Sequence, residues 1–277
     1  MPKTSESSSF DISGKIAVVT GATGVLGGAA CLALAKAGVK IAAIGRDEAK
    51  LKTLAAAVSK AGSECLTLPA DCLVRGDLEN ACAKTIKQWG RVDFLLNFAG
   101  GNRPDATTAP DRPFFNLPKE ALEAAVGLNL LGTVLPCQVF GKAMAERGEG
   151  AIVNVSSMAA ARPLTRIVGY SAAKAAVDNF TQWLAVHLAK EYSPRLRVNA
   201  IAPGFFLTEQ NRFLLTDEKS GQPTERGKSI LQHTPMARFG APDDLTGAIV
   251  WLLSPAAAFV TGVVLPIDGG FNAFSGV

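Results

Sequence analysis

A short apolar run followed by a glycine-rich turn is the feature that most limits what this chain can fold into. Residues 16–20 are apolar, as in a strand buried on both faces, and the turn at residues 21–28 leads into a helical pattern that ends near Ala37. Glycine lets the backbone approach a pyrophosphate, and the amino terminus of the helix supplies N–H donors. We therefore expect a nucleotide cofactor to contact Gly21, Thr23, Gly24, Val25 and Leu26.

Strand and helix patterns alternate along the rest of the chain. Further strands are expected at residues 40–44, 65–69, 94–97, 151–155, 197–201 and 263–267. Helices are expected at residues 48–61, 76–89, 119–147, 170–192, 226–233 and 243–253. This alternation predicts an α/β Rossmann fold in a single domain, with a seven-stranded parallel sheet flanked by helices on both faces. Ligands of such sheets bind at the carboxyl ends of the strands.

Three segments are expected within this organisation. Residues 1–13 form an N-terminal tail, and residues 14–277 form the single oxidoreductase domain. Residues 205–240 are polar and interrupted, which is typical of a lid over a substrate.

Composition excludes several classes of partner. The net charge is +4, from 28 basic and 24 acidic residues without a basic run, which argues against nucleic acid. The five cysteines form no C-x-x-C pair, so we expect reduced thiols and no metal site. The chain starts without a hydrophobic signal region, and no apolar run approaches the roughly 20 residues that span a bilayer. We expect a cytoplasmic protein that acts on a small molecule, away from membranes.

The tips of the second and third strands favour one form of the cofactor. Arg46 follows the second strand, where arginine can hold a 2′-phosphate, so NADP is slightly favoured over NAD. Asp47 weakens this argument, although it reads better as the cap of the next helix, and a solvated Arg/Asp pair is the alternative. After the third strand, Asp71 can accept from an adenine amino group or can cap a helix, and Cys72 follows it.

Two further strand tips carry small or turn-forming residues that let a cofactor lie across them. Those expected to contact the cofactor are Asn97, Ala99, Gly100, Pro203, Gly204, Phe206 and Thr208.

A hydroxyl, a phenol and an ammonium meet near the tip of the fifth strand. Ser157 follows that strand, and Tyr170 and Lys174 are four residues apart, so they share one face of the next helix. These groups predict a proton-transfer site that also contacts the cofactor. Asn129 lies within an apolar helical pattern and is either a satisfied core polar group or part of a kink that binds water.

Taken together, these residues resemble the short-chain dehydrogenase/reductase family over essentially the whole chain. The matching elements are the turn at Gly21, the Asn97-Phe98-Ala99-Gly100 turn, Asn129, Ser157, Tyr170-x-x-x-Lys174, Pro203-Gly204 with Thr208, and Asp268-Gly269-Gly270. More narrowly, the chain looks like the D-mannonate (fructuronate) oxidoreductase branch, in residues 23–28, 100–102, 156–158, 162–165, 179–183 and 204–212. Two departures are Val25, at the place of the usual second glycine of the turn, and Phe98, at the second place of the usual Asn-Asn-Ala-Gly.

The resemblance implies an NAD(P)-dependent enzyme that interconverts an alcohol and a ketone. Tyr170 would exchange the proton, Lys174 would lower the pKa of Tyr170, and Ser157 would donate to the reacting oxygen. The family implies that Asn129 holds a water in a proton relay and that Thr208 meets the nicotinamide carboxamide. It also implies a homo-oligomer, a dimer or tetramer, formed through the helices that carry Asn129 and Tyr170.

A sugar-acid substrate would need a cation for its carboxylate, because guanidinium matches carboxylate in a bidentate fork. Asn102 is a further candidate for the substrate site, and the arginines that border the strand tips are Arg103, Arg162, Arg166, Arg212 and Arg238. Phenylalanines in the expected lid leave room for another carbonyl, such as a sugar ketone, a 3-ketoacyl chain or a steroid. A non-catalytic scaffold that binds the cofactor is the remaining alternative.

Overall fold

The centre of the molecule is a sheet of seven parallel strands, counted over the described residues 9–208, 212–217 and 220–276 of this computed structural model. Its order is β3-β2-β1-β4-β5-β6-β7, which confirms the expected fold class. Residues 1–8 of the expected tail, and 209–211 and 218–219 of the expected lid, lie outside the described residues. The strands are β1 Ile16–Thr20, β2 Lys40–Gly45, β3 Cys65–Pro69, β4 Phe94–Asn97, β5 Gly150–Val155, β6 Leu196–Pro203 and β7 Val264–Ile267.

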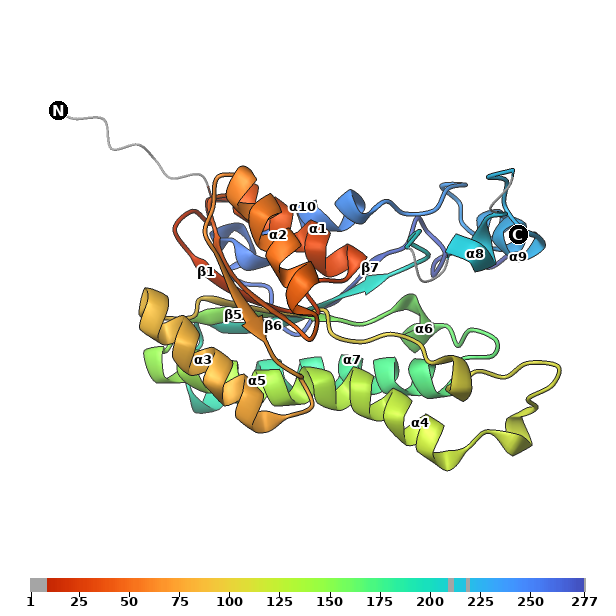
Figure 1. The fold of residues 1–277 in the computed structure, drawn as a ribbon, viewed down its shortest axis with the longest axis horizontal. Coiled ribbons are helices and arrows are strands. Elements are labelled where there is room, and N and C mark those ends of the chain that lie inside the picture. The colour runs from red at the N-terminus through yellow and green to blue at the C-terminus, as the bar shows by residue number, and fades with distance from the viewer. Residues whose placement is uncertain (1–8, 209–211, 218–219, 277) are drawn as a thin grey trace.

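Helices cover both faces of the sheet, as Figure 1 shows. On one face lie α1 (Val25–Lys36), α2 (Glu48–Lys60) and α10 (Thr246–Leu253); on the other lie α3 (Arg75–Trp89), α5 (Gly132–Arg147) and α7 (Val168–Glu191). The two cores divide β1 by its pleat, because Val19 packs with one set of helices and Val18 with the other. Burial on both faces explains why the strands are continuous apolar runs rather than alternating ones.

The strand order changes direction at β1, and parallel sheets bind their ligands at the carboxyl ends of the strands beside such a point. Strand β1 pairs with β2 on one side and β4 on the other, so the connections leaving β1 and β4 diverge there. Short elements gather at the same end of the molecule (Figure 1). They are α6 (Met158–Ala161), α8 (Arg212–Leu215) and α9 (Glu225–Gln232).

The expected helix at residues 119–147 is not one regular helix. It consists of α4 (Lys119–Val126), a π-helical turn at Gly127–Leu131, and α5. A π turn widens the helix and marks a site where a side chain disturbs the regular hydrogen-bond ladder, which here is Asn129. The stretch Lys119–Arg147 is long and apolar enough to cross a membrane, but half of its most apolar window is buried in the fold. It serves here as a core helix.

Candidate active site

The three side chains of the expected proton-transfer site come from two elements that meet at the carboxyl tip of β5. Ser157 is mostly buried and begins α6, where its hydroxyl accepts a 3.1 Å hydrogen bond from the Ala159 N–H. Tyr170 lies in the first turn of α7, and the Lys174 ammonium is 5.7 Å from the centre of its ring. A hydrogen bond joins Tyr170 to Ser157. The phenol is thus bracketed by a hydroxyl and a cation.

Lys174 is held by a group that the sequence did not reveal. Its ammonium donates a 2.7 Å hydrogen bond to the main-chain carbonyl of Val155, and only 4% of the residue is exposed. Burial lowers the pKa of Lys174 to about 8, and the charge of Asp178 opposes this shift. Asp178 lies one helical turn further along α7, so the i,i+4 spacing was a signal that could have identified it.

The pKa of the Tyr170 phenol is shifted in the opposite direction from the one we expected. Burial raises the pKa of the phenol, and the hydrogen bond with Ser157 only partly offsets that rise. For the protein alone, burial therefore outweighs the lowering of this pKa that we expected from Lys174, whose ammonium is directed at the Val155 carbonyl.

Asn129 clamps the loop that follows β4. Its amide oxygen accepts from the Gly101 N–H at 3.0 Å, and its amide nitrogen donates to the carbonyls of Gly101 at 2.9 Å and Ala125 at 2.8 Å. A Cβ on Gly100 would lie 2.8 Å from the Asn129 amide oxygen and 3.3 Å from the Lys174 ammonium. The loop, the π turn and α7 therefore meet at one point. Asn129 is a satisfied buried group at a kink, and its binding of water stays a prediction.

The first glycine turn has the form of a phosphate cradle. Gly21 has a φ of +61°, and a Cβ there would lie 2.6 Å from the Ala99 nitrogen. Helix α1 starts after Gly24 with no side-chain cap, and its first turn contains no acidic residue. Its amino terminus keeps main-chain donors and a positive dipole end for an anion, so these residues fit a dinucleotide. Thr23 lies beside this turn, with its side chain 3.2 Å from a Cβ built on Gly45, and Val25 and Leu26 open α1.

The tips of β2 and β3 lie together. Asp47 caps α2 by accepting from the Lys50 N–H at 3.0 Å, which confirms the cap interpretation. Asp71 accepts from the Leu73 N–H at 2.9 Å, so it stabilises a turn. Burial raises the pKa of the Cys72 thiol to about 11, with the charge of Asp71 adding to that rise and Arg46 opposing it. Arg46 is therefore close to Cys72, with its side chain exposed.

Two expected cofactor contacts have side chains committed to the protein. The fully buried Asn97 amide donates to the Asn154 side-chain oxygen at 2.8 Å and joins β4 to β5. Phe206 is 4% exposed, and a Cβ on Gly240 would lie 2.6 Å from its ring. The Ala99 N–H donates a 3.3 Å hydrogen bond to the hydroxyl of Thr20, the last residue of β1.

The turn after β6 packs closely against the turn after β7. Pro203 ends β6, and a Cβ on Gly204 would lie 2.7 Å from the Asp268 Cα. Thr208 is partly buried, four residues beyond Gly204 in the described part of the expected lid.

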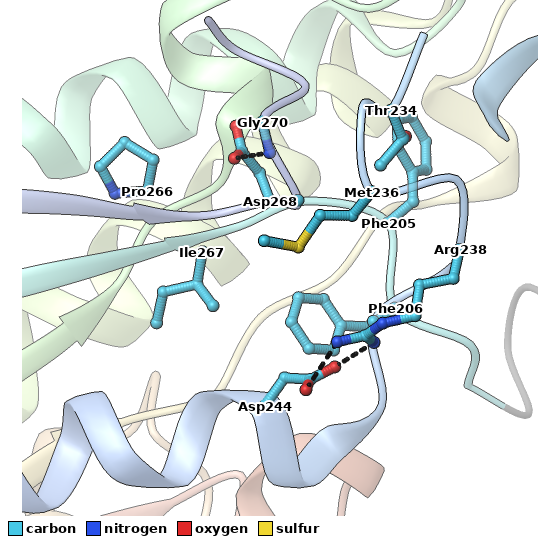
Figure 2. A pocket seen from close by; sticks show the side chains of 12 residues that line it. Phe205, Phe206, Thr234, Met236, Arg238, Asp244, Pro266, Ile267, Asp268 and Gly270 are labelled. Carbon is cyan, nitrogen blue, oxygen red and sulfur yellow. Dashed lines mark hydrogen bonds and ion pairs between the residues drawn. The ribbon is translucent and has the colours of Figure 1, made fainter. Parts of the chain in front are cut away.

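A cavity of about 390 Å³ lies under the expected lid, between the loop after β6 and the end of β7. Figure 2 shows Phe206, Met236 and Ile267 around it, with Arg238 and Asp244 paired at one side. Its lining residues do not include Ser157 or Tyr170. This cavity is therefore separate from the proton-transfer groups.

The arginines that are candidates for binding a substrate carboxylate differ in the partners they have within the protein. Arg103 makes a bidentate pair with Asp105 at 3.0 and 2.7 Å, and Arg238 makes one with Asp244 at 2.6 and 3.0 Å. These two guanidinium groups already hold carboxylates. Arg162 donates to the Asn272 carbonyl at 2.9 Å, and Asn102 donates to the Thr107 hydroxyl at 3.0 Å.

Arg166 and Arg212 are the other two arginines that we consider for the substrate carboxylate. Both are exposed, and neither guanidinium forms an ion pair or hydrogen bond with any residue in the described part of the chain.

Known proteins match this chain over most of its length. A family model described as enoyl-(acyl carrier protein) reductase matches residues 21–272. The uncharacterised oxidoreductase UxuB of Bacillus subtilis is 43% identical over 276 residues, which cover 96% of this chain and 98% of the relative.

Several similar solved structures carry a bound nicotinamide cofactor. A provisionally named D-mannonate oxidoreductase from Haemophilus influenzae with bound NAD has 40% identity and a TM-score of 0.90, and the match covers 96% of this chain and 98% of the other. A provisionally named NAD(P)-dependent gluconate 5-dehydrogenase from Beutenbergia cavernae, with bound NADP at low occupancy, has 30% identity and a TM-score of 0.83, over 95% and 99% of the two chains.

Proposed function

Because this chain belongs to the short-chain dehydrogenase/reductase family, we propose that its NAD(P)-dependent alcohol–ketone chemistry acts on a sugar acid of the D-mannonate/D-fructuronate type. The observation that carries the reaction type is the meeting of Ser157, Tyr170 and Lys174 at the tip of β5. The substrate class is supported by the name of the NAD-bound structure that is 40% identical to this chain.

Each of these side chains has a distinct part in the proposal. Tyr170 exchanges a proton with the reacting oxygen, and the Ser157 hydroxyl donates to that oxygen as charge develops on it. Lys174 supplies positive charge beside the phenol, which favours the phenolate. Asn129 holds the loop after β4 in register with α7 through its three hydrogen bonds, and a water near it would link Lys174 to solvent.

The bound nicotinamide cofactor supplies or accepts the hydride. The turn at Gly21, Thr23 and Gly24, with Val25 and Leu26 at the start of α1, would hold the pyrophosphate. The exposed Arg46 would meet a 2′-phosphate, which supports a preference for NADP. We expect Arg46→Ala to weaken NADPH binding more than NADH binding, measured by quenching of tryptophan fluorescence; equal weakening would contradict this preference. The remaining expected contacts are Asp71, Cys72, Asn97, Ala99, Gly100, Pro203, Gly204, Phe206 and Thr208.

A substrate panel tests the proposed function. D-mannonate, D-fructuronate, D-mannitol, D-fructose and a ketoacyl thioester are each mixed with the protein and either NAD(H) or NADP(H), and NAD(P)H absorbance is followed. Turnover of the sugar acids, above that of the neutral sugars, is expected. Turnover confined to the thioester would favour the ketoacyl alternative, which the apolar side chains of Phe206, Met236 and Ile267 in the cavity lining support. An absence of turnover with intact cofactor binding would favour a scaffold.

We further propose that the protein forms a homo-oligomer, and that residues 14–277 form a single domain. Trp183, Val186 and Leu131 expose 57, 60 and 47% of their surfaces on α7 and the π turn, and a second copy would cover them. Light scattering after size-exclusion chromatography measures the mass. Limited proteolysis tests residues 14–277 as one domain, with first cuts expected in the 1–13 tail and the 205–240 lid.

A further inference from the structure

Arg166 has a backbone conformation that is unusual for its residue type. Its φ is +75°, and within the described residues only Ala237 shares a positive φ among residues other than glycine. This region suits glycine, whereas the Cβ of an L-residue is strained there. Such strain persists only where the surrounding structure imposes it, and it concentrates at functional sites.

Two contacts hold the chain at Arg166 and shortly after it. The Thr108 N–H, in the loop after β4, donates a 2.9 Å hydrogen bond to the Arg166 carbonyl. Three residues later, Gly169 is buried against α4, where a Cβ would lie 3.3 Å from Ala125 and from Leu122. The chain is thus tied to the loop at Arg166 itself and to α4 at Gly169. Arginine occupies a position where glycine would fit without strain, which suggests that the side chain is needed.

The charge of Arg166 is also available. Among the candidate arginines, those at 103 and 238 already face carboxylates, whereas the exposed Arg166 guanidinium has no such partner in the described residues. Helix α7 begins two residues later, at Val168, without a side-chain cap or an acidic residue in its first turn. The positive end of its dipole therefore adds to the cation in attracting an anion.

We propose that Arg166 binds the carboxylate of the sugar acid, an inference that rests on the proposed function. Arg166 lies between Ser157 and Tyr170 in sequence, four residues before the phenol. A guanidinium held on a pinned backbone can grip a carboxylate in a bidentate fork and so fix the distance from that end of the substrate to Tyr170. The strained conformation is retained because it presents the side chain at this place.

The test compares D-fructuronate with D-fructose, which has a hydroxymethyl group where the acid has its carboxylate. Dissociation constants are measured by calorimetry with NADPH or NADH bound, in a Tyr170→Phe background that prevents turnover, and KM values are measured with Tyr170 intact. The variants are Arg166→Gly, Arg166→Lys and Arg212→Gln. Arg195→Gln is the charge control, because Arg195 is exposed and lies just before β6, at the opposite edge of the sheet.

Arg166→Gly should weaken D-fructuronate binding by about 10- to 100-fold, the effect of losing a charge-assisted hydrogen-bond pair, and leave D-fructose binding unchanged. The melting temperature should stay the same or rise, because glycine relieves the strain. Arg166→Lys should keep part of the affinity for the acid, and Arg195→Gln all of it.

Three results would overturn the proposal. These are equal losses for acid and neutral sugar, a lower melting temperature with unchanged selectivity in Arg166→Gly, and a loss of selectivity in Arg212→Gln alone. Failure of the proposed function would instead be visible in the unmodified enzyme, as an absence of turnover with every sugar acid.

Discussion

The Lys174 ammonium donates a 2.7 Å hydrogen bond to the carbonyl of Val155, the last residue of β5. This bond joins the second turn of α7 to β5, the strand that Ser157 follows in the chain. It also satisfies one donor of a cation that is almost wholly buried. Lys174 is therefore part of the link between helix and sheet, as well as a neighbour of Tyr170.

The depressed pKa of Lys174 predicts a pH-dependent stability. Below pH 8, Lys174 is protonated in both states, so the folded protein bears the full cost of a buried ammonium. Between its folded pKa of about 8 and its usual value of 10.5, the folded state releases the proton while the unfolded state keeps it. The free energy of unfolding therefore increases with pH in this range. This group alone contributes a slope that approaches about 1.4 kcal/mol per pH unit.

Lys174→Met removes this contribution. In urea unfolding without cofactor at pH 7 to 10, the difference in unfolding free energy, wild type minus variant, should increase with pH above about 8. Subtracting the two curves cancels titrations that the proteins share, such as those of the buried cysteines. Parallel curves would show that Lys174 keeps its ordinary pKa.

Tyr170→Phe should remove the proton-transfer group and keep the ring. We expect kcat to fall by about 10²- to 10⁴-fold, the usual contribution of general acid–base catalysis. Cofactor affinity, measured by fluorescence titration, should change little, because the pyrophosphate cradle lies at the other end of the site. A variant with wild-type kcat would refute the role of Tyr170.

Asn129→Ala should loosen the loop after β4. It leaves the Gly101 N–H and two carbonyls without their partner, and we expect a loss of about 1–3 kcal/mol in the free energy of unfolding. Thr133→Val is the matched variant, because it removes the single 3.0 Å hydrogen bond to the Asn129 carbonyl. Its cost should be smaller, about 1 kcal/mol. If Thr133→Val were the more damaging change in chemical denaturation, the clamp would be misassigned.

Most of the fold was predictable from the sequence because burial on both faces leaves continuous apolar strands. The expected bounds of the strand at residues 65–69 match β3, and those of the strand at 94–97 match β4. The π turn at Asn129 was not predictable as such, because it depends on Gly101, which is 28 residues away in the chain. Periodicity within a helix carries no information about such a contact.

The candidate site divides in the same way. The i,i+4 spacing was enough to bring Tyr170 and Lys174 together, whereas the partner of Lys174 is a main-chain carbonyl and leaves no mark in residue type. For Arg103, the sequence did offer a warning, since Asp105 is only two residues away. The positive φ of Arg166 had no signal at all, since residue type favours glycine there and its carbonyl partner, Thr108, is 58 residues away in the chain.

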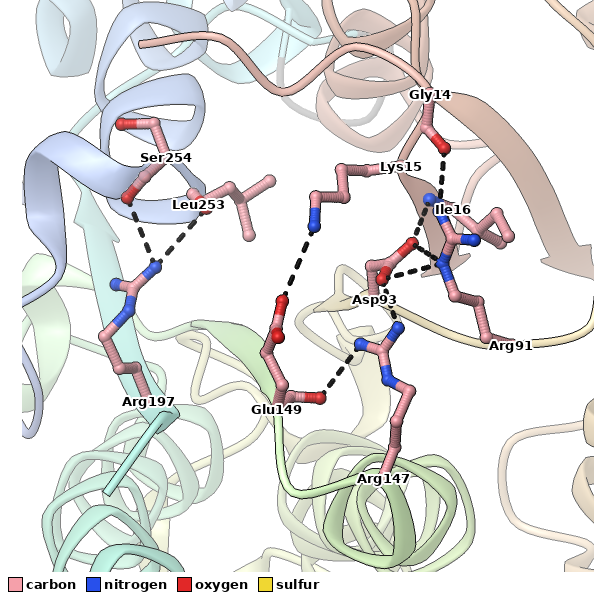
Figure 3. A network of polar contacts seen from close by, with 10 residues as sticks. All are labelled: Gly14, Lys15, Ile16, Arg91, Asp93, Arg147, Glu149, Arg197, Leu253 and Ser254. Atoms are coloured by element: carbon pink, nitrogen blue, oxygen red, sulfur yellow. Dashed lines mark hydrogen bonds and ion pairs between the residues drawn. The ribbon is translucent and has the colours of Figure 1, made fainter. Parts of the chain in front are cut away.

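Asp93 anchors the edge of the sheet opposite the active site. Figure 3 shows Arg91 and Arg147 converging on its carboxylate, with oxygen–nitrogen distances of 3.0 and 2.6 Å, and it also accepts from the Ile16 N–H at 2.9 Å. The residue is 2% exposed. Asp93→Asn would leave two partly exposed arginines facing a neutral group, and we expect it to cost about 1–3 kcal/mol in the free energy of unfolding.

The same network offers a control. Glu149 pairs with Lys15 at 3.5 Å, and both side chains are well exposed, so Glu149→Gln should cost no more than about 0.5 kcal/mol. Urea denaturation at pH 7 measures both variants. Because Asp93 precedes β4 while the active-site loop follows it, kcat of the folded Asp93→Asn enzyme should be near the wild-type value at temperatures well below melting. Equal costs for the two substitutions would mean that the buried pair is no stronger than the surface one.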